Sequence, residues 1–205
     1  MPDTTARDEV LRQQTLTALQ ILDTAPEDEF DAVVKAARRI FGCRTSFISF
    51  IDSDRQWFKA REGTDLRETP RDCSICAIAV EQNREILVED LQAHPQFSKH
   101  PAVADTPELR FYASIPLAGP TIGEASAPIG TLCVIDDHPR TATPEELSEL
   151  RQLALVIESL LRPRLDAKLS RIALAERRAL IDNLHRTHRQ FELAEQMAQI
   201  GHWRL

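Results

Sequence analysis

The sequence predicts an α+β fold in which helices pack against an antiparallel sheet. Helical periodicity appears at both ends of residues 1–161, and two pairs of segments rich in β-branched and aromatic residues lie between them. Each pair is joined by a polar loop, as in an antiparallel hairpin. This succession of helices and hairpins indicates one domain of about 160 residues.

The first hairpin is expected between two helices near the N-terminus and a short helix further on. Its strands are residues 45–51 and 56–60, joined by the turn Asp52-Ser53-Asp54. The first strand is apolar on both faces, which predicts a central position in the sheet with both faces covered.

The other elements are predicted from the same helical and strand patterns of apolar residues. A helix is expected to begin at Thr24, as the N-cap of a capping box with Glu27, and to end at Gly42. The last long helix should begin after Thr143 as its N-cap. The remaining expected elements are helices at 9–22 and 74–81, a strand at 86–91, a long polar connection at 92–109, and a second hairpin of 110–118 with 129–135.

Composition and charge place the chain among globular proteins and exclude several partners. It is 42% hydrophobic and 28% charged. Residues 162–205 carry nine basic and five acidic residues, which leaves 16 basic and 27 acidic residues in 1–161. A net charge of −11 there argues against nucleic acid as a partner. Without a membrane span, a secretory segment or disulfide-rich cysteine spacing, we expect a cytoplasmic protein with no membrane insertion.

The sequence predicts a parallel homodimer that is joined along its terminal helices and along the basic helix beyond Pro163. Apolar residues recur at spacings of three and four, which is typical of a coiled coil. A step of nine from Ile172 to Ile181 breaks the heptad frame, and Pro163 predicts a kink. The expected seam is Leu150, Ile157, Leu161, Leu165, Leu169, Ile172, Ile181, Leu184, His188 and Phe191.

Five strings carry a family resemblance. They are Leu-Asp-Thr-Ala-Pro-Glu-Asp-Glu-Phe-Asp (22–31), Ile-Asp-Ser-Asp-Arg-Gln-Trp-Phe-Lys (51–59), Arg-Glu-Thr-Pro-Arg-Asp (67–72), Phe-Tyr-Ala-Ser-Ile-Pro-Leu (111–117) and Ile-Gly-Thr-Leu-Cys-Val-Ile-Asp (129–136). In this order they resemble a GAF domain of the bacterial type found N-terminal to sensor histidine kinases and GGDEF diguanylate cyclases. The resemblance implies a six-stranded antiparallel sheet, with the terminal helices on one face and a small-molecule pocket on the other.

Residues 194–205, Ala-Glu-Gln-Met-Ala-Gln-Ile-Gly-His-Trp-Arg-Leu, resemble the opening of a PAS domain. The two resemblances together imply a GAF-like sensor domain at 1–162, a helical linker at 163–193 and the beginning of a PAS domain at 194–205. They also imply that these 205 residues belong to a longer signalling protein.

The ligand implied by the resemblance is a small molecule of unknown identity. Three of the expected pocket residues have an alternative role: His94 and Phe97 would pin the 92–109 connection to the core, and Trp57 would be a packing residue. Three arginines, Arg61, Arg71 and Arg110, are candidate anchors for an acidic ligand, although surface ion pairs would explain them equally. The expected pocket residues are Trp57, Cys76, His94, Phe97, Tyr112 and Cys133.

No cofactor, metal or catalytic residue is expected in this chain. Ala77, where bilin-binding GAF domains commonly have histidine after the cysteine, departs from their pattern, and we expect neither bilin nor haem. The Asn-Lys-x-Phe-Asp-type signature of cyclic-nucleotide-binding members is absent. Residues 92–109 contain no cysteine, so the chain lacks the nucleophiles of the related free methionine sulfoxide reductases. No glycine-rich phosphate loop, His-Glu-x-x-His or Gly-x-Ser-x-Gly occurs.

Cys73-Ser74-Ile75-Cys76 is a C-x-x-C motif at the start of a predicted helix. A helix N-terminus lowers a thiol pKa, so a redox-active thiol or half of a metal site is one interpretation. The other is that Cys76 is a small core residue, as in related GAF sequences, and that Cys73 is incidental.

These observations predict a sensory module that relays ligand binding or dimerisation through a linker helix to a PAS domain and an output domain. A diguanylate cyclase is the favoured output, with a sensor histidine kinase as the alternative. Two other readings remain open, a ligand-free dimerisation module and a thiol-based redox sensor.

Overall fold

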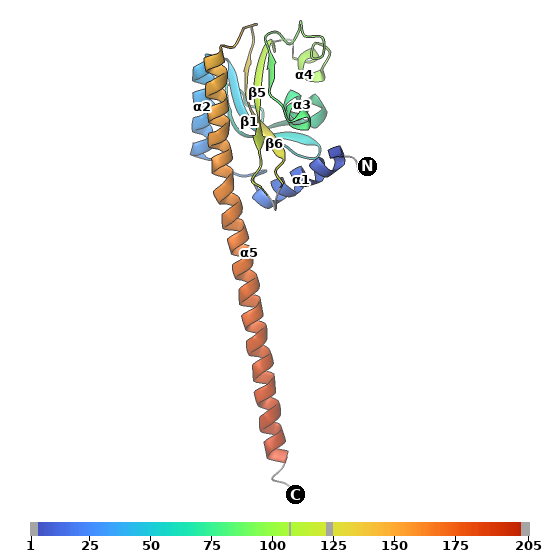
Figure 1. Ribbon diagram of the computed structural model, residues 1–205, viewed down its shortest axis with the longest axis vertical. Coiled ribbons are helices and arrows are strands. Elements are labelled where there is room, and N and C mark those ends of the chain that lie inside the picture. The colour runs from blue at the N-terminus through green and yellow to red at the C-terminus, as the bar shows by residue number, and fades with distance from the viewer. Residues whose placement is uncertain (1–3, 107, 122–124, 202–205) are drawn as a thin grey trace. The chain divides into compact units, whose positions relative to one another are not determined.

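Six antiparallel strands form one sheet in the order β3-β2-β1-β6-β5-β4 (Figure 1). The computed structural model describes residues 4–106, 108–121 and 125–201. The chain divides into two units, Met1–Arg164 and Leu165–Leu205, and the sheet belongs to the first. The strands are β1 (Thr45–Ile51), β2 (Arg55–Glu62), β3 (Glu68–Pro70), β4 (Ile86–Val88), β5 (Phe111–Ala118) and β6 (Pro128–Asp136). The predicted α+β class and the six-stranded antiparallel sheet are confirmed.

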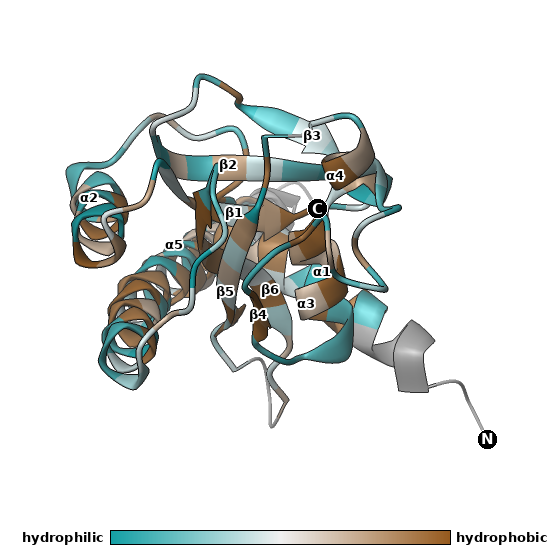
Figure 2. Ribbon diagram, turned by 90° about the horizontal axis from the view of Figure 1, so that it is seen from above, coloured by the Kyte–Doolittle hydropathy of each residue, from teal (hydrophilic) through white to brown (hydrophobic). Residues whose placement is uncertain are grey.

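Helices cover both faces of this sheet. In Figures 1 and 2, α2 and the first turns of α5 lie on one face, and α3 and α4 lie on the other. Figure 2 shows apolar residues concentrated in the central strands between these layers. The helices are α1 (Thr4–Leu19), α2 (Asp28–Phe41), α3 (Ile75–Gln82), α4 (Pro101–Ala104) and α5 (Pro144–Gly201), with a 3₁₀ turn at Arg71–Cys73.

β1 is the central strand that its two apolar faces predicted. It pairs with β2 on one side and β6 on the other. Phe47 and Ile51 pack in the cluster under α3, whereas Ile48 and Phe50 alternate with them onto the α2 face and are fully buried. Because both faces of β1 are buried against other elements, contacts on both faces specify its position in the sheet.

The helix ends show where local signals decide and where tertiary contacts override them. Gly42 ends α2 in the left-handed conformation, with φ 56°, as predicted. Thr143 and Glu146 form a reciprocal capping box at the start of α5, with Glu146 N–H donating to Thr143 Oγ1 at 3.1 Å. The prediction of a capping box at Thr24 is wrong, because α2 begins at Asp28. The Thr24 hydroxyl instead donates to Ile21 O and accepts from Lys59 Nζ.

Two elements escaped sequence analysis. β3 is a polar, three-residue edge strand that contains a proline, and it is held by pairing with β2. The 92–109 connection contains α4, a single helical turn. Both elements depend on the surface against which they pack rather than on their own periodicity.

Three residues of the expected dimer seam belong to the core of the first unit. Leu150, Ile157 and Leu161 are fully buried there, so the structure corrects their assignment to a seam between copies. α5 includes Pro163 within its length. In the second unit Leu165 is buried, whereas the remaining expected seam residues are exposed: Leu169, Ile172, Ile181, Leu184, His188 and Phe191. Among the described residues no helix combines the length and apolar character required to cross a membrane.

Candidate functional site

A cavity of about 360 Å³ opens on the α3–α4 side of the sheet. β1, β2 and β3 form one wall, and α3, α4, the start of β5 and the end of β6 contribute the rest of the lining. This volume is at the lower end of the range for small-molecule sites in proteins. The larger apolar side chains that line it are Phe47, Phe58, Leu66, Ile75, Leu109, Tyr112 and Ile135.

Strand alternation and the start of α3 position these walls. Phe47 on β1 and Phe58 on β2 point to the same face, and their rings stack with centroids 4.5 Å apart. The Ser74 hydroxyl caps α3 by accepting from Ala77 N–H at 3.0 Å, which fixes the first turn and directs Cys76 toward the sheet.

A row of hydrogen-bonded polar side chains, all buried except the partly exposed Thr69, crosses the sheet beneath the cavity. Thr69 Oγ1 donates to Gln56 Oε1 at 3.3 Å, and Gln56 Nε2 donates to Ser49 Oγ at 2.9 Å. Ser49 Oγ and Thr131 Oγ1 share a hydrogen bond at 3.2 Å. Because unpaired polar groups are costly inside an apolar core, this pairing accounts for the presence of hydroxyl and amide groups on the central strands. Thr69 and Gln56 line the cavity and present polar atoms to it.

Cys76 is the acidic thiol of this cluster. Burial raises the pKa of Cys76, but hydrogen bonding with Cys133, Thr131, Tyr112 and Ser49 outweighs that effect and brings the pKa to about 6. Cys76 Sγ lies 3.0 Å from Tyr112 Oη. Burial raises the pKa of Cys133 and of Tyr112 well above their ordinary values, so both stay protonated and donate.

The other cysteine of the motif has a different environment. Cys73 lines the cavity but is partly exposed, and burial followed by the charge of Asp72 raises its pKa. Burial also raises the pKa of Cys43, to about 11. All four cysteines are free thiols. The two cysteines of the C-x-x-C motif are therefore chemically unlike, and Cys76 is the one buried under the sheet.

Replacing each thiol separately should expose this difference. Cys76→Ser should abolish a thiolate absorbance that titrates near pH 6 in the folded protein, whereas Cys73→Ser should keep it. The pKa of Cys76 is lower in the folded protein than in the unfolded chain. Its contribution to stability is therefore complete above pH 9 and lost as the pH falls through 6.

Denaturation measured across that pH range checks the sign of the effect. Wild type and Cys73→Ser should gain stability between pH 6 and 9, and Cys76→Ser should gain less. At pH 6 we expect Cys76→Ser to cost about 1 kcal/mol, since its hydroxyl can still bond to Tyr112, and Cys73→Ser to cost less than about 0.5 kcal/mol. Identical titrations in wild type and Cys76→Ser would contradict the assignment.

Charged residues gather at the mouth of the cavity. Asp105, Glu108 and Asp137 are exposed carboxylates that line it. Asp136 is only 3% exposed. Its Oδ1 accepts from Arg44 N–H at 3.3 Å and from Asp137 N–H at 3.1 Å, which ties the end of β6 to the start of β1.

Asp136, Asp137 and His138 bring ligand-type atoms within 4.8 Å of one another. Hydrogen bonds from His138 and then from Arg44 lower the pKa of Asp137. Arg44 Nη1 donates to Asp137 Oδ2 at 3.1 Å, and His138 Nε2 lies 3.4 Å from Asp136 Oδ2. We assign this group to local ion pairing at the cavity mouth.

The structure brings only part of the sequence-predicted pocket together. Cys76 and Tyr112 line the cavity, and Cys133 lies fully buried in the same cluster. The other three residues, Trp57, His94 and Phe97, do not line it.

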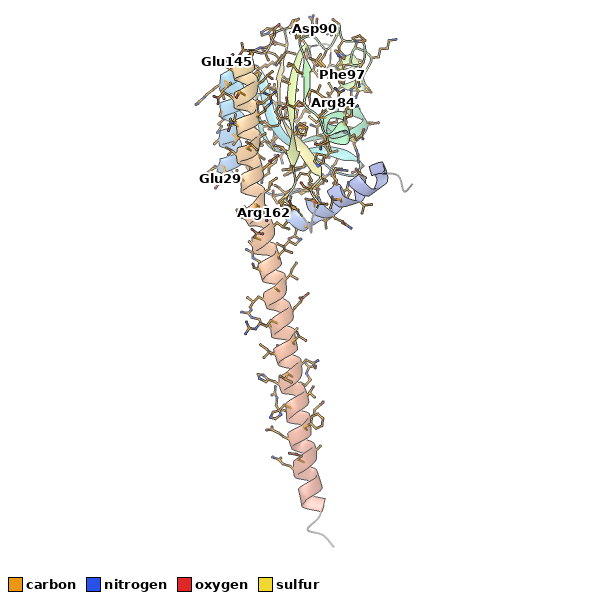
Figure 3. The ribbon with its side chains drawn as sticks, viewed as in Figure 1. Glu29, Arg84, Asp90, Phe97, Glu145 and Arg162 are labelled. Carbon is orange, nitrogen blue, oxygen red and sulfur yellow. The ribbon has the colours of Figure 1, made fainter. Side chains whose placement is uncertain are left out.

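Each of these three has a structural reason for its place. Trp57 alternates with Phe58 and so faces away from the cavity. His94 stacks on Phe97 with ring centroids 4.9 Å apart, and its Nδ1 accepts from Gln96 N–H, so it holds the loop together. Phe97 is buried in the core under that loop, and Figure 3 shows it on the side of the sheet opposite Glu29 of α2.

The three candidate arginine anchors also lie outside the cavity lining. Arg110 forms a two-point ion pair with Asp90, at 2.8 and 2.7 Å, and Arg71 pairs with Glu9. Sequence reasoning missed Phe47, Phe58, Gln56 and Thr69 as lining residues. Alternation within the first hairpin would have found the two phenylalanines and Gln56, since all three share one face.

The family model described as "GAF domain" matches residues 25–161. A curated relative, cyclic di-GMP phosphodiesterase PA2567 of Pseudomonas aeruginosa, is 38% identical over 133 residues, which are 65% of this chain and 22% of that protein. This chain therefore corresponds to about a fifth of the length of that relative.

Solved structures share the fold at low sequence identity. The free methionine-R-sulfoxide reductase of Neisseria meningitidis, solved in complex with its substrate, matches with a TM-score of 0.52 and 18% identity over 83% of this chain and 95% of that one. The GAF domain of an Acinetobacter phosphoenolpyruvate-protein phosphotransferase matches with a TM-score of 0.53 and 13% identity, over 79% and 95% of the two chains. With the family model covering most of the sheet domain, the chain belongs to the GAF domain family.

Proposed function

We propose that this chain is a sensory module whose cavity binds a small molecule and controls an output domain of the same protein. The observation that carries the proposal is the cavity itself, which has aromatic walls, a polar row beneath it and a charged mouth. Apolar pockets with a few converging polar groups are the usual sites of small ligands.

We propose that the output acts in cyclic di-GMP turnover. Support comes from the relative named as a cyclic di-GMP phosphodiesterase, which is 38% identical to this chain over 133 residues. The diguanylate cyclase favoured from the sequence belongs to the same signalling chemistry with the opposite direction, and the sensor histidine kinase is the second candidate. The PAS domain stays a prediction, since residues 194–201 continue α5 and residues 202–205 lie outside the described part of the chain.

Two substitutions in α4 test the sensory proposal in the cell. Ala102 is half-buried and lines the cavity, whereas Ala104, two residues further along the same turn, is exposed and does not. Ala102→Phe should fill the cavity and shift the cellular level of cyclic di-GMP, and Ala104→Phe should leave it at the wild-type value. Equal levels in all three strains would contradict the proposed control of cyclic di-GMP turnover.

We also propose that two copies of the chain pair in parallel through the second unit. Leu184 and Phe191 are 69% and 68% exposed, and leucines and isoleucines near them are also exposed. Exposed apolar residues at helical spacing are stabilised when a second helix covers them. A parallel pair would present both output domains at the same end, which suits a relay by small changes of helix register.

Light scattering on the full chain tests the pairing. Leu184→Lys with Phe191→Lys should convert a dimer to a monomer, because two charges would be buried at the seam. Leu155→Lys, at an exposed leucine of the first unit, is the matched control and should stay dimeric. If the double variant remains a dimer, the interface lies elsewhere, and dissociation by Leu155→Lys would place it in the first unit.

A further inference from the structure

The cavity described above is acidic at its mouth. Four carboxylates line it, from Asp105, Glu108, Asp136 and Asp137, and Arg44 is the single cationic lining residue in the described part of the chain. The Arg44 guanidinium already donates to Asp137 at 3.1 Å. One guanidinium cannot balance four carboxylates, so the electrostatic potential at the mouth is negative.

Three carboxylate groups at this mouth have unused acceptor capacity. The side chains of Asp105 and Glu108 make no hydrogen bond or ion pair with another described residue. Asp136 Oδ2 is buried and has no hydrogen-bond partner among the described residues, although His138 Nε2 lies 3.4 Å from it. A buried carboxylate oxygen without a donor is costly, and a bound cation nearby would lower that cost.

The aromatic walls of the cavity also favour a positively charged ligand. Phe47 and Phe58 offer a stacked pair of aromatic rings, and Tyr112 adds a third. Aromatic faces attract cations and pack well against flat apolar groups. Leu66 is 58% exposed beside the mouth and offers further apolar surface for a ligand to cover.

An anionic ligand would meet the opposite conditions. Its phosphate or carboxylate would face the four carboxylates with no unpaired arginine or lysine in the described lining. Two of the three arginines expected to serve as acidic-ligand anchors are paired elsewhere, Arg110 with Asp90 and Arg71 with Glu9, and the third, Arg61, does not line the cavity. Like charges in such proximity disfavour binding.

Resting on the proposed sensory function, we propose that the cavity binds a small organic cation: a flat apolar body against Phe47 and Phe58, with an ammonium group at the mouth near Asp105 and Glu108. This class excludes cyclic dinucleotides and other anionic nucleotides as ligands of this site.

Three indole compounds with the same ring and different charge test the class. Tryptamine carries an ammonium group, tryptophol a neutral hydroxyl and indole-3-propionate a carboxylate. By calorimetric titration of the full chain at low salt, tryptamine should bind about tenfold more tightly than tryptophol, and indole-3-propionate should bind most weakly. Added salt should narrow the difference. Equal affinities, or a preference for indole-3-propionate, would overturn the assignment of charge.

Replacing the carboxylates at the mouth by neutral amides tests whether they are the source of the attraction for the ammonium group. Asp105→Asn with Glu108→Gln should weaken tryptamine binding by about tenfold and leave tryptophol binding unchanged. Glu29→Gln with Glu149→Gln makes the same change of net charge on exposed helix positions that do not line the cavity, and it should alter neither affinity. If both double variants weaken tryptamine equally, the attraction comes from the whole domain, and the proposed mouth is wrong.

The Ala102→Phe variant separates this inference from the sensory function. Loss of all three probes in Ala102→Phe, with no preference among them in wild type, keeps the cavity as a ligand site and rejects the cation. Binding of tryptamine that survives Ala102→Phe places the probe outside the cavity and rejects the inference. If none of the three probes binds, the inference of a cationic ligand is also rejected. Whether the cavity is a ligand site at all is then decided by whether the purified protein retains a small molecule there.

Discussion

Gly130→Ala should destabilise the sheet domain strongly, lowering its free energy of unfolding by about 4 kcal/mol. Gly130 lies on β6 opposite Phe50 of the central strand β1. A Cβ atom there would lie 2.0 Å from the carbonyl oxygen of Ser49 and 2.9 Å from the Phe50 ring. Neither strand can move away, because both are paired on their other side.

The matched control is Gly42→Ala, at the end of α2. Gly42 has a φ of 56° but open space around it, so a methyl group there should cost only about 1–2 kcal/mol of backbone strain. Urea denaturation followed by circular dichroism measures both variants. A Gly130→Ala protein as stable as Gly42→Ala would show that β1 and β6 are less closely packed than described.

Lys59→Met should destabilise the domain by about 3 kcal/mol. The Lys59 side chain is fully buried, and its ammonium donates to Thr24 Oγ1 at 2.8 Å, Ala25 O at 2.7 Å and Glu27 Oε1 at 2.5 Å. Methionine keeps the apolar stem but leaves these three acceptors without their donor. Chemical denaturation of the variant measures the loss.

Arg164→Met is the control for charge, because Arg164 also pairs with Glu27 at 2.9 Å but is partly exposed. It should cost less than about 1 kcal/mol. Desolvation of Glu27 is outweighed by its hydrogen bonds from Lys59 and Arg164, which lower its pKa below 4.5. The stability from this ion pair is therefore present above pH 4.5, is lost as the pH falls through the folded-state pKa, and should be much smaller in Lys59→Met. Equal acid sensitivity in Lys59→Met and wild type would contradict the role of Lys59.

These contacts join the cavity to the last helix within the first unit. β2 carries Gln56 and Phe58 on the cavity face and Lys59 on the other. Glu27 then accepts from both Lys59 and Arg164 of α5. A shift of β2 caused by a ligand would thus reach α5 through Glu27, which is how the proposed sensor would pass on its signal.

The sequence predicted most of the fold because its main elements have strong periodicity of their own. The two apolar faces of β1, the glycine end of α2 and the capping box at Thr143 all depend on neighbours within a few residues. Thr24 shows the limit, since its hydroxyl serves a lysine 35 positions away that no local pattern reveals. The seam residues Leu150, Ile157 and Leu161 show another, because a core stripe and a dimer stripe have the same spacing.

The site was harder to predict than the fold for a related reason. A cavity depends on which strand faces meet and on how a loop closes over them. Trp57 and Phe58 are adjacent in the sequence, yet only Phe58 lines the cavity. The family resemblance implied a pocket on this face of the sheet, and Cys76 and Tyr112 were predicted from their expected positions among the helices and strands.

Native mass spectrometry of the purified full chain tests the central claim, that the cavity under α3 and α4 holds a small molecule. Wild type and Ala104→Phe should carry a bound mass that is released on denaturation, and Ala102→Phe should lack it. The same bound mass in Ala102→Phe, or no bound mass in any of the three proteins, would contradict a ligand site in this cavity.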